Sequence, residues 1–249
     1  MTNTLRRLFF FWLFGLSSIT WAHSHDIALT LDDLPFVGEQ KNFHLKMIID
    51  TLKSHDIPAT GFVIAGNVQA ENWPVLQQFK AAGFGVGNHT LSHASAATMS
   101  TNAYIQQIGE ADKILSPVLT KPKYFRYPYL AMGEGAKKIS IINYLSSKSY
   151  HIAPITIDSQ DFVFNQLLLT VPEASRRHFM TLLKPCYLDF IWEQTQKAET
   201  HSRLNKKTDQ AQILLIHSNL LNAYALGEII DLYQQHGYRF ISLEDALKS

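Results

Sequence analysis

The stretch Asp26-Ile27-Ala28-Leu29-Thr30-Leu31 decides which fold this chain can adopt. It is a short apolar run of the kind that forms a buried strand. Residues 43–54 follow it as a predicted helix with an apolar face made of Leu45, Ile48, Ile49 and Leu52. An apolar run followed by a helical pattern then recurs to the end of the chain. Strands that alternate with helices form βα units around a parallel sheet.

The remaining units follow the same order. Further strands are predicted at residues 59–64, 83–88, 124–127, 152–157, 212–216 and 238–243, and further helices at 73–82, 102–115, 135–148 and 221–236. Seven units without a linker or repeat between them predict an α/β fold, a distorted seven-stranded (β/α) barrel in a single domain. Residues 163–209 are the least regular stretch. We expect an elaborated connection there, forming a wall or lid of a site, or else a helix with a solvated charged face.

Composition excludes several classes of protein. The 249 residues are 46% hydrophobic, and 22 Lys and Arg stand against 21 Asp and Glu, so the chain is neither disordered nor strongly charged. A nucleic-acid-binding protein would carry clustered Lys and Arg and a high pI. No nucleic-acid partner is therefore expected.

Residues 1–22 have the pattern of a signal peptide. Arg6 and Arg7 precede an apolar run at residues 8–16, and Thr20-Trp21-Ala22 offers small residues for cleavage. The run is short for a membrane span, although an uncleaved anchor is the other interpretation. We expect export to the periplasm or the medium, no stable membrane insertion after cleavage, and a catalytic domain at residues 23–249.

Cleavage after Ala22 would leave a histidine, His25, at the third position of the mature chain. The sequence His23-Ser24-His25 with a free amine would suit Cu²⁺ or Ni²⁺. The competing interpretation is a frayed polar terminus.

Titratable side chains follow five of the predicted strands. They are Asp32 and Asp33, His89 and His93, Arg126 with Tyr129, Asp158 and Asp161, and His217. In a parallel barrel, catalytic groups come from the C-terminal ends of the strands, so these side chains are expected to converge. Taken alone, adjacent aspartates are often turn residues and a His-x-x-x-His pair is often accidental. Together, two imidazoles and one carboxylate form the usual open site for a catalytic Zn²⁺.

Five segments resemble the ordered motifs of the NodB-homology polysaccharide deacetylases, carbohydrate esterase family 4. They are Thr30-Leu31-Asp32-Asp33, His89-Thr90-Leu91-Ser92-His93, Arg126-Tyr127-Pro128-Tyr129, Asp158-Ser159-Gln160-Asp161-Phe162 and Leu215-Ile216-His217. The resemblance runs from about Asp26 to the C-terminus. It implies a distorted (β/α) barrel and a metal-dependent hydrolase that removes N-acetyl, and sometimes O-acetyl, groups from sugars.

The resemblance also implies a role for each residue. Asp33, His89 and His93 would hold a divalent metal, Zn²⁺ or Co²⁺. Asp32 would be the general base, paired with Arg126, and His217 would be the general acid, paired with Asp161. The backbone N–H of Tyr129 would stabilise the oxyanion, and Leu215 would line the pocket for the acetyl methyl group.

Three positions depart from the family pattern. Leu31 stands where Phe is usual, Leu34-Pro35 replaces a Gly, and Phe162 replaces a Trp. Phe162 keeps an apolar wall but lacks the indole donor. Asp158 is expected to have a structural role only.

The predicted substrate is an acetylated glycan such as peptidoglycan or N-acetylglucosamine oligomers. The alternatives are a metal-dependent amidase or esterase acting on a non-polymeric substrate, and a non-catalytic carbohydrate-binding relative. A metal-dependent hydrolase of the amidohydrolase type would need His-x-His at the end of the first strand, whereas His23-Ser24-His25 precedes that strand. A glycosidase using Asp32 and Asp161 would leave both histidines of the second motif, Arg126 and His217 unexplained.

Overall fold

The computed structural model describes residues 25–207 and 210–249, so the predicted signal peptide lies outside the described residues. The strands are β1 (His25–Val37), β2 (Ala59–Val63), β3 (Gly85–Asn88), β4 (Lys123–Phe125), β5 (Tyr150–Ile152), β6 (Ile157–Asp158), β7 (Gln212–Asn219) and β8 (Tyr238–Ile241). The α-helices are α1 (Lys41–Ser54), α2 (Trp73–Ala81), α3 (Thr101–Leu115), α4 (Gly135–Ser147), α5 (Asp161–Thr170), α6 (Glu173–Leu204), α7 (Leu220–Gln235) and α8 (Leu243–Ala246). Three short 3₁₀ turns are η1 (Ala65–Asn67), η2 (Ala70–Asn72) and η3 (Pro128–Leu130).

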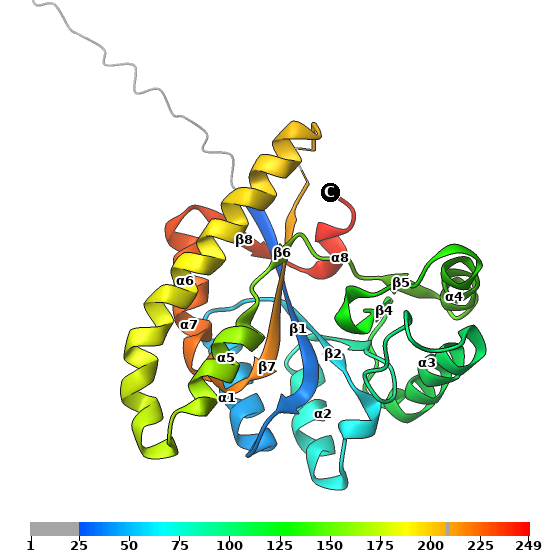
Figure 1. The fold of residues 1–249 in the computed structure, drawn as a ribbon, viewed down its shortest axis with the longest axis horizontal. Helices are drawn as coiled ribbons and strands as arrows, with labels where there is room; N and C mark the ends of the chain where they lie inside the picture. The colour runs from blue at the N-terminus through cyan, green and yellow to red at the C-terminus, as the bar shows by residue number, and fades with distance from the viewer. Residues whose placement is uncertain (1–24, 208–209) are drawn as a thin grey trace, which may run out of the picture.

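The strands are all parallel and lie in the order β5-β4-β3-β2-β1-β7-β6, and β8 pairs with the first residues of β1. Figure 1 shows β1 and β7 at the centre, with α5, α6 and α7 beside β7 and with α3 and α4 beyond β4 and β5. The prediction of a distorted (β/α) barrel in one domain is confirmed, and the sheet has eight strands because one of the seven predicted strands is divided into β5 and β6.

The predicted strand at residues 152–157 is wrong, because the chain changes partners within it. Its first part, β5, pairs with β4, and its last part, β6, pairs with β7. Between them the Ala153 N–H donates to Phe125 O at 2.9 Å, and the Thr156 N–H donates to Ile213 O at 3.0 Å. Pro154 has no N–H to continue a strand ladder. This bent segment therefore spans the side on which the barrel is incomplete.

The core lies between the sheet and its helices. Alternate residues of β1 and β7, among them Leu29, Leu31, Leu214 and Ile216, are buried in the same apolar cluster as the predicted face of α1. Successive side chains of a strand point to opposite faces, so Thr30 lies on the inner face of the barrel. There its hydroxyl donates to Leu214 O at 2.7 Å.

The expectation of an irregular connection at residues 163–209 is wrong, because almost all of it is helical. Its long helix, α6, buries residues at helical spacing, namely Met180, Leu183, Tyr187, Ile191 and Thr195. Pro185 within this helix and the charges around it hide the periodicity in the sequence. The interpretation as a helix with a solvated charged face is the one that fits. Among the described residues, no helix has both the length and the apolar character needed to cross a bilayer.

Candidate functional site

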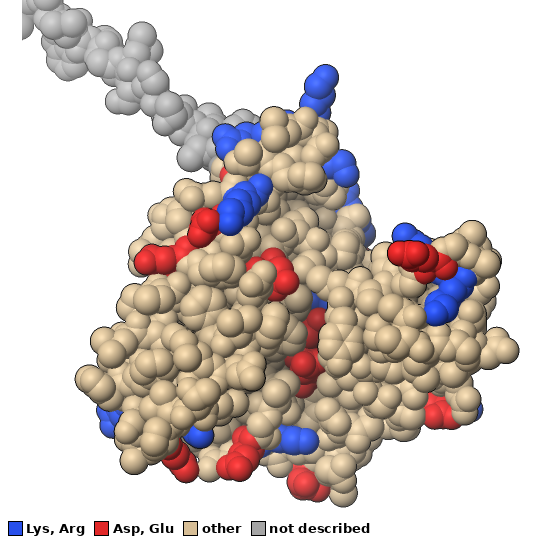
Figure 2. Space-filling model, in the orientation of Figure 1, with Lys and Arg blue, Asp and Glu red and all other residues tan. Residues whose placement is uncertain are grey.

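The C-terminal ends of β1, β3, β4 and β7 bring the predicted site residues together. Figure 2 shows a cleft between the α5–α6 side and the α3–α4 side of the molecule, with acidic atoms deep inside it. Asp32 on β1 and His217 on β7 are register partners. The Oδ2 atom of Asp32 also lies 3.6 Å from His89 Nε2.

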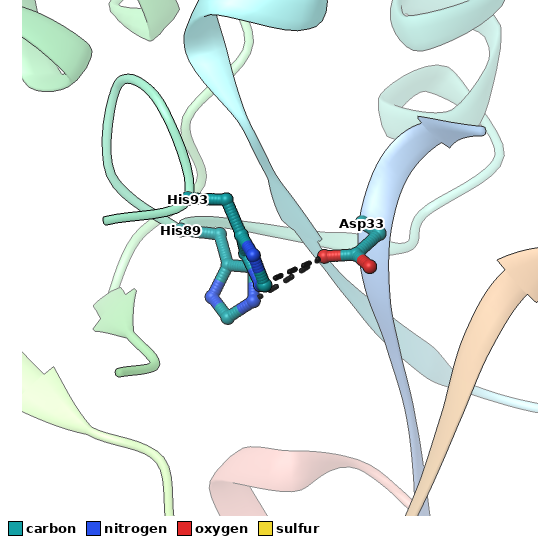
Figure 3. Close-up of side chains that lie close together, drawn as sticks. All are labelled: Asp33, His89 and His93. Atoms are coloured by element: carbon teal, nitrogen blue, oxygen red, sulfur yellow. Dashed lines mark ion pairs between the residues drawn. The ribbon is translucent and has the colours of Figure 1, made fainter. Parts of the chain in front are cut away.

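Three candidate metal ligands converge on one point. One Asp33 oxygen, Oδ1, lies 3.5 Å from His89 Nε2 and 3.3 Å from His93 Nε2, and Figure 3 shows both rings directed at it. Ligand atoms about 2.0–2.1 Å from a tetrahedral ion lie about 3.3 Å apart, which matches these separations. The Asp33 Oδ1 atom is buried and has no hydrogen-bond partner among the described residues. A buried carboxylate oxygen without a donor is costly, and a cation would satisfy it. The residues therefore fit a divalent metal.

The tautomer of His89 suits this role. Its Nδ1 lies 2.9 Å from the Arg126 carbonyl oxygen, which can only accept, so Nδ1 carries the proton and Nε2 is left with its lone pair. Burial lowers the pKa of His93, and the nearby Asp33 charge opposes that shift. His89 therefore directs a ring nitrogen at Asp33, and burial favours the neutral form of His93 that binds a cation.

The loop that carries both histidines is held from η1 and from β3. The N–H groups of Ala65 and Gly66 donate to Thr90 O at 3.0 Å and to Leu91 O at 2.7 Å. A Cβ atom on Gly66 would lie 2.6 Å from Leu91 O, so only glycine allows this approach. The buried Asn88 accepts from the Thr90 N–H at 2.8 Å. Asn88 is not among the predicted site residues, although a polar residue at the end of an otherwise apolar strand is a signal that could have found it.

Arg126 holds Asp32 and also the segment that bridges the open barrel. Its Nη1 donates to Asp32 Oδ1 at 2.9 Å and to Thr30 Oγ1 at 2.7 Å. Its Nε and Nη2 donate to the carbonyl oxygens of Ala153 and Pro154. The side chain is fully buried, and burial lowers the pKa of the guanidinium while Asp32 opposes that shift. Asp32 therefore has a buried counter-charge on Oδ1, while its second oxygen, Oδ2, faces His89 Nε2 at 3.6 Å.

His217 is held by Asp161. The ring Nδ1 lies 2.7 Å from Asp161 Oδ1, and the backbone N–H of His217 donates to Asp161 Oδ2 at 2.9 Å. Burial by itself lowers the pKa of His217, but the charge and hydrogen bond of Asp161, helped by Asp32 and Asp33, raise it to about 9. Burial raises the pKa of Asp161, yet its contacts with His217 and Asn219 bring it below its usual value. His217 is therefore a cation at pH 7 and Asp161 is a carboxylate.

Three further side chains donate to Asp161, and none of them is among the predicted site residues. Asn219 Nδ2 donates to Asp161 Oδ2 at 2.6 Å, Asn222 Nδ2 donates to the same oxygen, and Ser159 Oγ donates to Oδ1 at 3.2 Å. The two asparagines come within five residues of His217 in the sequence, which is the signal that could have found them.

The sequence predicts four more residues for the site, and the structure places each of them as follows. Tyr129 has a left-handed backbone, φ 56°, and its ring centroid lies 4.5 Å from that of His93. Leu215 is buried and lies two residues before His217, on the same face of β7. Phe162 is 52% exposed and meets the His217 ring edge-on at 6.1 Å. The carboxylate of Asp158 accepts from the Gln160 N–H at 3.0 Å, a turn contact consistent with a structural role.

The proposed terminal copper or nickel site lies largely outside the described residues, which exclude His23 and Ser24. His25 is described, and its Nδ1 lies 3.0 Å from Glu199 Oε1.

Comparisons with known proteins agree on one family. The family model for polysaccharide deacetylase matches residues 22–144. The chitin deacetylase of Colletotrichum lindemuthianum is 30% identical over 145 residues, which are 56% of this chain and 54% of that protein. A peptidoglycan-N-acetylglucosamine deacetylase of Bacillus cereus is 31% identical over 139 residues, which are 55% of this chain and 46% of that protein. The chain thus spans about half the length of these curated relatives.

Solved structures share the fold over most of the chain. The Colletotrichum lindemuthianum chitin deacetylase superposes with a TM-score of 0.63 and 22% identity, covering 90% of this chain and 88% of that chain. A CE4 family pseudoenzyme from Bacillus anthracis superposes with a TM-score of 0.64 and 19% identity, covering 90% of this chain and 66% of that chain. This chain is thus similar in sequence to the polysaccharide deacetylase family over residues 22–144, and it shares the curled (β/α) barrel of the solved CE4 structures over most of its length.

Proposed function

We propose that this chain is an exported, metal-dependent hydrolase that removes acetyl groups, N-acetyl above all, from a glycan such as peptidoglycan or N-acetylglucosamine oligomers. The observation that carries the proposal is the arrangement around the Asp33–His89–His93 cluster. A carboxylate paired with a buried arginine and an imidazole paired with a buried carboxylate stand on adjacent strands beside it. The names of the relatives support the choice of an acetylated glycan.

Asp33, His89 and His93 would hold the metal, and the donor set of one carboxylate and two imidazoles suits Zn²⁺ or Co²⁺. A divalent cation in such a site acidifies water and polarises a carbonyl group.

The chain's own residues supply the proton transfers. Asp32 accepts a proton from the attacking water through Oδ2, because Oδ1 is occupied by Arg126. The backbone N–H of Tyr129 donates to the acetyl oxygen as negative charge develops on it. His217 donates its Nε2 proton to the leaving nitrogen, because its Nδ1 is occupied by Asp161. The carbon–nitrogen bond breaks, and the products are acetate and a free amine.

Leu215 and Phe162 would form the apolar surroundings of the acetyl methyl group. Both lie close to His217, one beside it on β7 and the other against its ring. Export rests on the leader-like residues 1–22, and the proposed catalytic domain is residues 23–249.

The test is acetate release by purified residues 23–249 from N-acetylglucosamine oligomers and peptidoglycan, after chelation and again after Zn²⁺ is added back. We expect release to disappear with the chelator and return with the metal. Co²⁺ added in place of Zn²⁺ shows which ion supports the faster reaction. If the protein binds one metal ion but releases no acetate from any glycan, the result would favour the alternative, an amidase or esterase acting on a non-polymeric substrate.

A second candidate is a non-catalytic carbohydrate-binding protein. The observation behind it is that a CE4 family pseudoenzyme has the same fold. Failure to bind metal, together with binding of the oligomers without acetate release, would favour it.

A further inference from the structure

We infer that Tyr187 is a positioning residue for the acid His217, and that it acts through Asn222 and Asp161. This inference rests on the proposed role of His217 as the general acid. Tyr187 lies on α6, thirty residues before His217 in the sequence, and none of the five motifs includes it.

The contacts form a continuous chain. The Tyr187 hydroxyl donates to Asn222 Oδ1 at 2.9 Å. The amide nitrogen of Asn222 donates to Asp161 Oδ2 and to the His217 carbonyl oxygen, the latter at 2.9 Å. Asp161 in turn holds the imidazole of His217 at 2.7 Å.

The chemistry of these groups determines the direction of each hydrogen bond. A carboxylate and a carbonyl oxygen only accept, so the Asn222 amide must turn its NH₂ group toward both of them. Its oxygen then faces Tyr187, which must be the donor. The Tyr187 hydroxyl on α6 therefore holds the other end of the Asn222 amide, in the orientation that Asp161 and the His217 carbonyl oxygen require.

Burial makes this chain of contacts rigid. Tyr187, Asn222 and Asp161 are each fully buried, so no solvent can replace a lost donor. The Tyr187 ring packs against Phe164 at 5.2 Å between centroids, and that contact does not need the hydroxyl. Tyr187→Phe thus removes the hydrogen bond and keeps the packing.

A mispositioned acid harms one class of substrate more than another. An amide needs a proton on its leaving nitrogen, whereas 4-nitrophenolate leaves without one. We expect Tyr187→Phe to lower kcat for N-acetylglucosamine oligomers about three- to tenfold, the usual effect of losing one neutral hydrogen bond. The kcat for 4-nitrophenyl acetate should stay within about twofold of the wild-type value.

Tyr233→Phe is the matched control. Tyr233 is also a buried tyrosine at the contact of α6 with α7, and its hydroxyl pairs with Thr195 at 2.7 Å rather than with the Asp161 group. It should lower the thermal midpoint about as much as Tyr187→Phe and leave the ratio of amide to ester turnover unchanged. Equal losses on both substrates in Tyr187→Phe, or no loss on either, would overturn the inference.

A spectroscopic readout separates this inference from the proposed function. In protein labelled with ¹⁵N-histidine, Tyr187→Phe should move the resonance of the His217 Nδ1 proton upfield, because its hydrogen bond to Asp161 becomes longer. Tyr233→Phe should leave it in place. If the wild type releases no acetate from any glycan, the proposed function fails, and this spectrum still decides the role of Tyr187. An unmoved resonance in Tyr187→Phe would refute it.

Discussion

Asp32 and His217 are register partners on the adjacent parallel strands β1 and β7. Register partners project from the same face of a sheet, so the backbone ladder holds the carboxylate and the imidazole next to each other. Each has its own buried partner of opposite charge, Arg126 for Asp32 and Asp161 for His217. The proposed base thus lies against a buried cation and the proposed acid against a buried carboxylate, although the two lie on neighbouring strands.

Asp32→Asn should lower acetate release about 10²–10⁴-fold without loss of metal, because the variant cannot accept a proton and is not a proposed ligand. Metal content is measured on the purified variant by mass spectrometry. Asp33→Asn is the matched control, and it should lose metal and activity together. Loss of metal from Asp32→Asn but not from Asp33→Asn would reverse the roles assigned to the two aspartates.

Loss of the His217 proton should lower the kcat of deacetylation at alkaline pH. The pKa of His217 is raised from the usual 6.5 to about 9, so the acid stays protonated through neutral pH and kcat should fall as the pH passes about 9. Asp161→Asn removes the charge that opposes the effect of burial, and the alkaline limb should move down by about 1–3 pH units. The profile of kcat against pH measures this.

The same ion pair should contribute to stability over a defined pH range. A pKa that is higher in the folded state means a contribution that is complete below pH 6.5 and is lost as the pH rises through 9. Wild type and Asp161→Asn should therefore differ least in unfolding free energy above pH 9. A gap that widens there would contradict the assignment.

Arg126→Met should cost about 3–5 kcal/mol of unfolding free energy, because it leaves the buried Asp32 carboxylate without its counter-charge. It also removes the donors to Ala153 O and Pro154 O, which hold the segment across the open side of the barrel. Urea denaturation measures the loss. Arg239→Met is the control, since its pair with Asp26 is at the surface and its loss should change stability little. Comparable losses in both variants would contradict the structural role of Arg126.

Gly66→Ala should weaken metal binding about tenfold or more, as substitutions that displace the support of metal ligands commonly do. The added methyl group would meet Leu91 O at 2.6 Å and push the loop that joins His89 to His93. Titration of the metal-free protein with Zn²⁺ measures the affinity. Gly227→Ala, where the nearest atom outside the helix is 3.8 Å away, should bind metal as the wild type does. Unchanged affinity in Gly66→Ala would show that the loop can yield without moving its ligands.

Local sequence patterns predicted most of the fold and the place of the site. The apolar run at residues 26–31 and the spacing of Leu45, Ile49 and Leu52 appear in the structure as β1 and the buried face of α1. Asp32 and His217 could be predicted as site residues because each lies at the end of a predicted strand. Parallel strands all end at the same edge of the sheet, so residues at their ends lie near one another.

Long-range contacts decided the rest. The sequence shows an apolar run at residues 152–157 but not that its two ends pair with different strands, because strand partners are chosen by backbone hydrogen bonding across the whole sheet. The helix at residues 173–204 carries Pro185 within a weak pattern, and only packing against Phe164 and the neighbouring helices shows which side is buried.

The sequence by itself determined the chemistry available to this protein: the carboxylates, the imidazoles and the arginine, in order, at the ends of strands. Only the tertiary structure decided how each group is oriented and which partner it meets. The tautomer of His89 depends on the carbonyl oxygen of Arg126, the residue that follows β4. The charge of His217 depends on the carboxylate of Asp161, which lies fifty-six residues earlier in the chain. Those contacts form between segments that are distant in the chain, because a buried polar atom must find its partner wherever folding brings one.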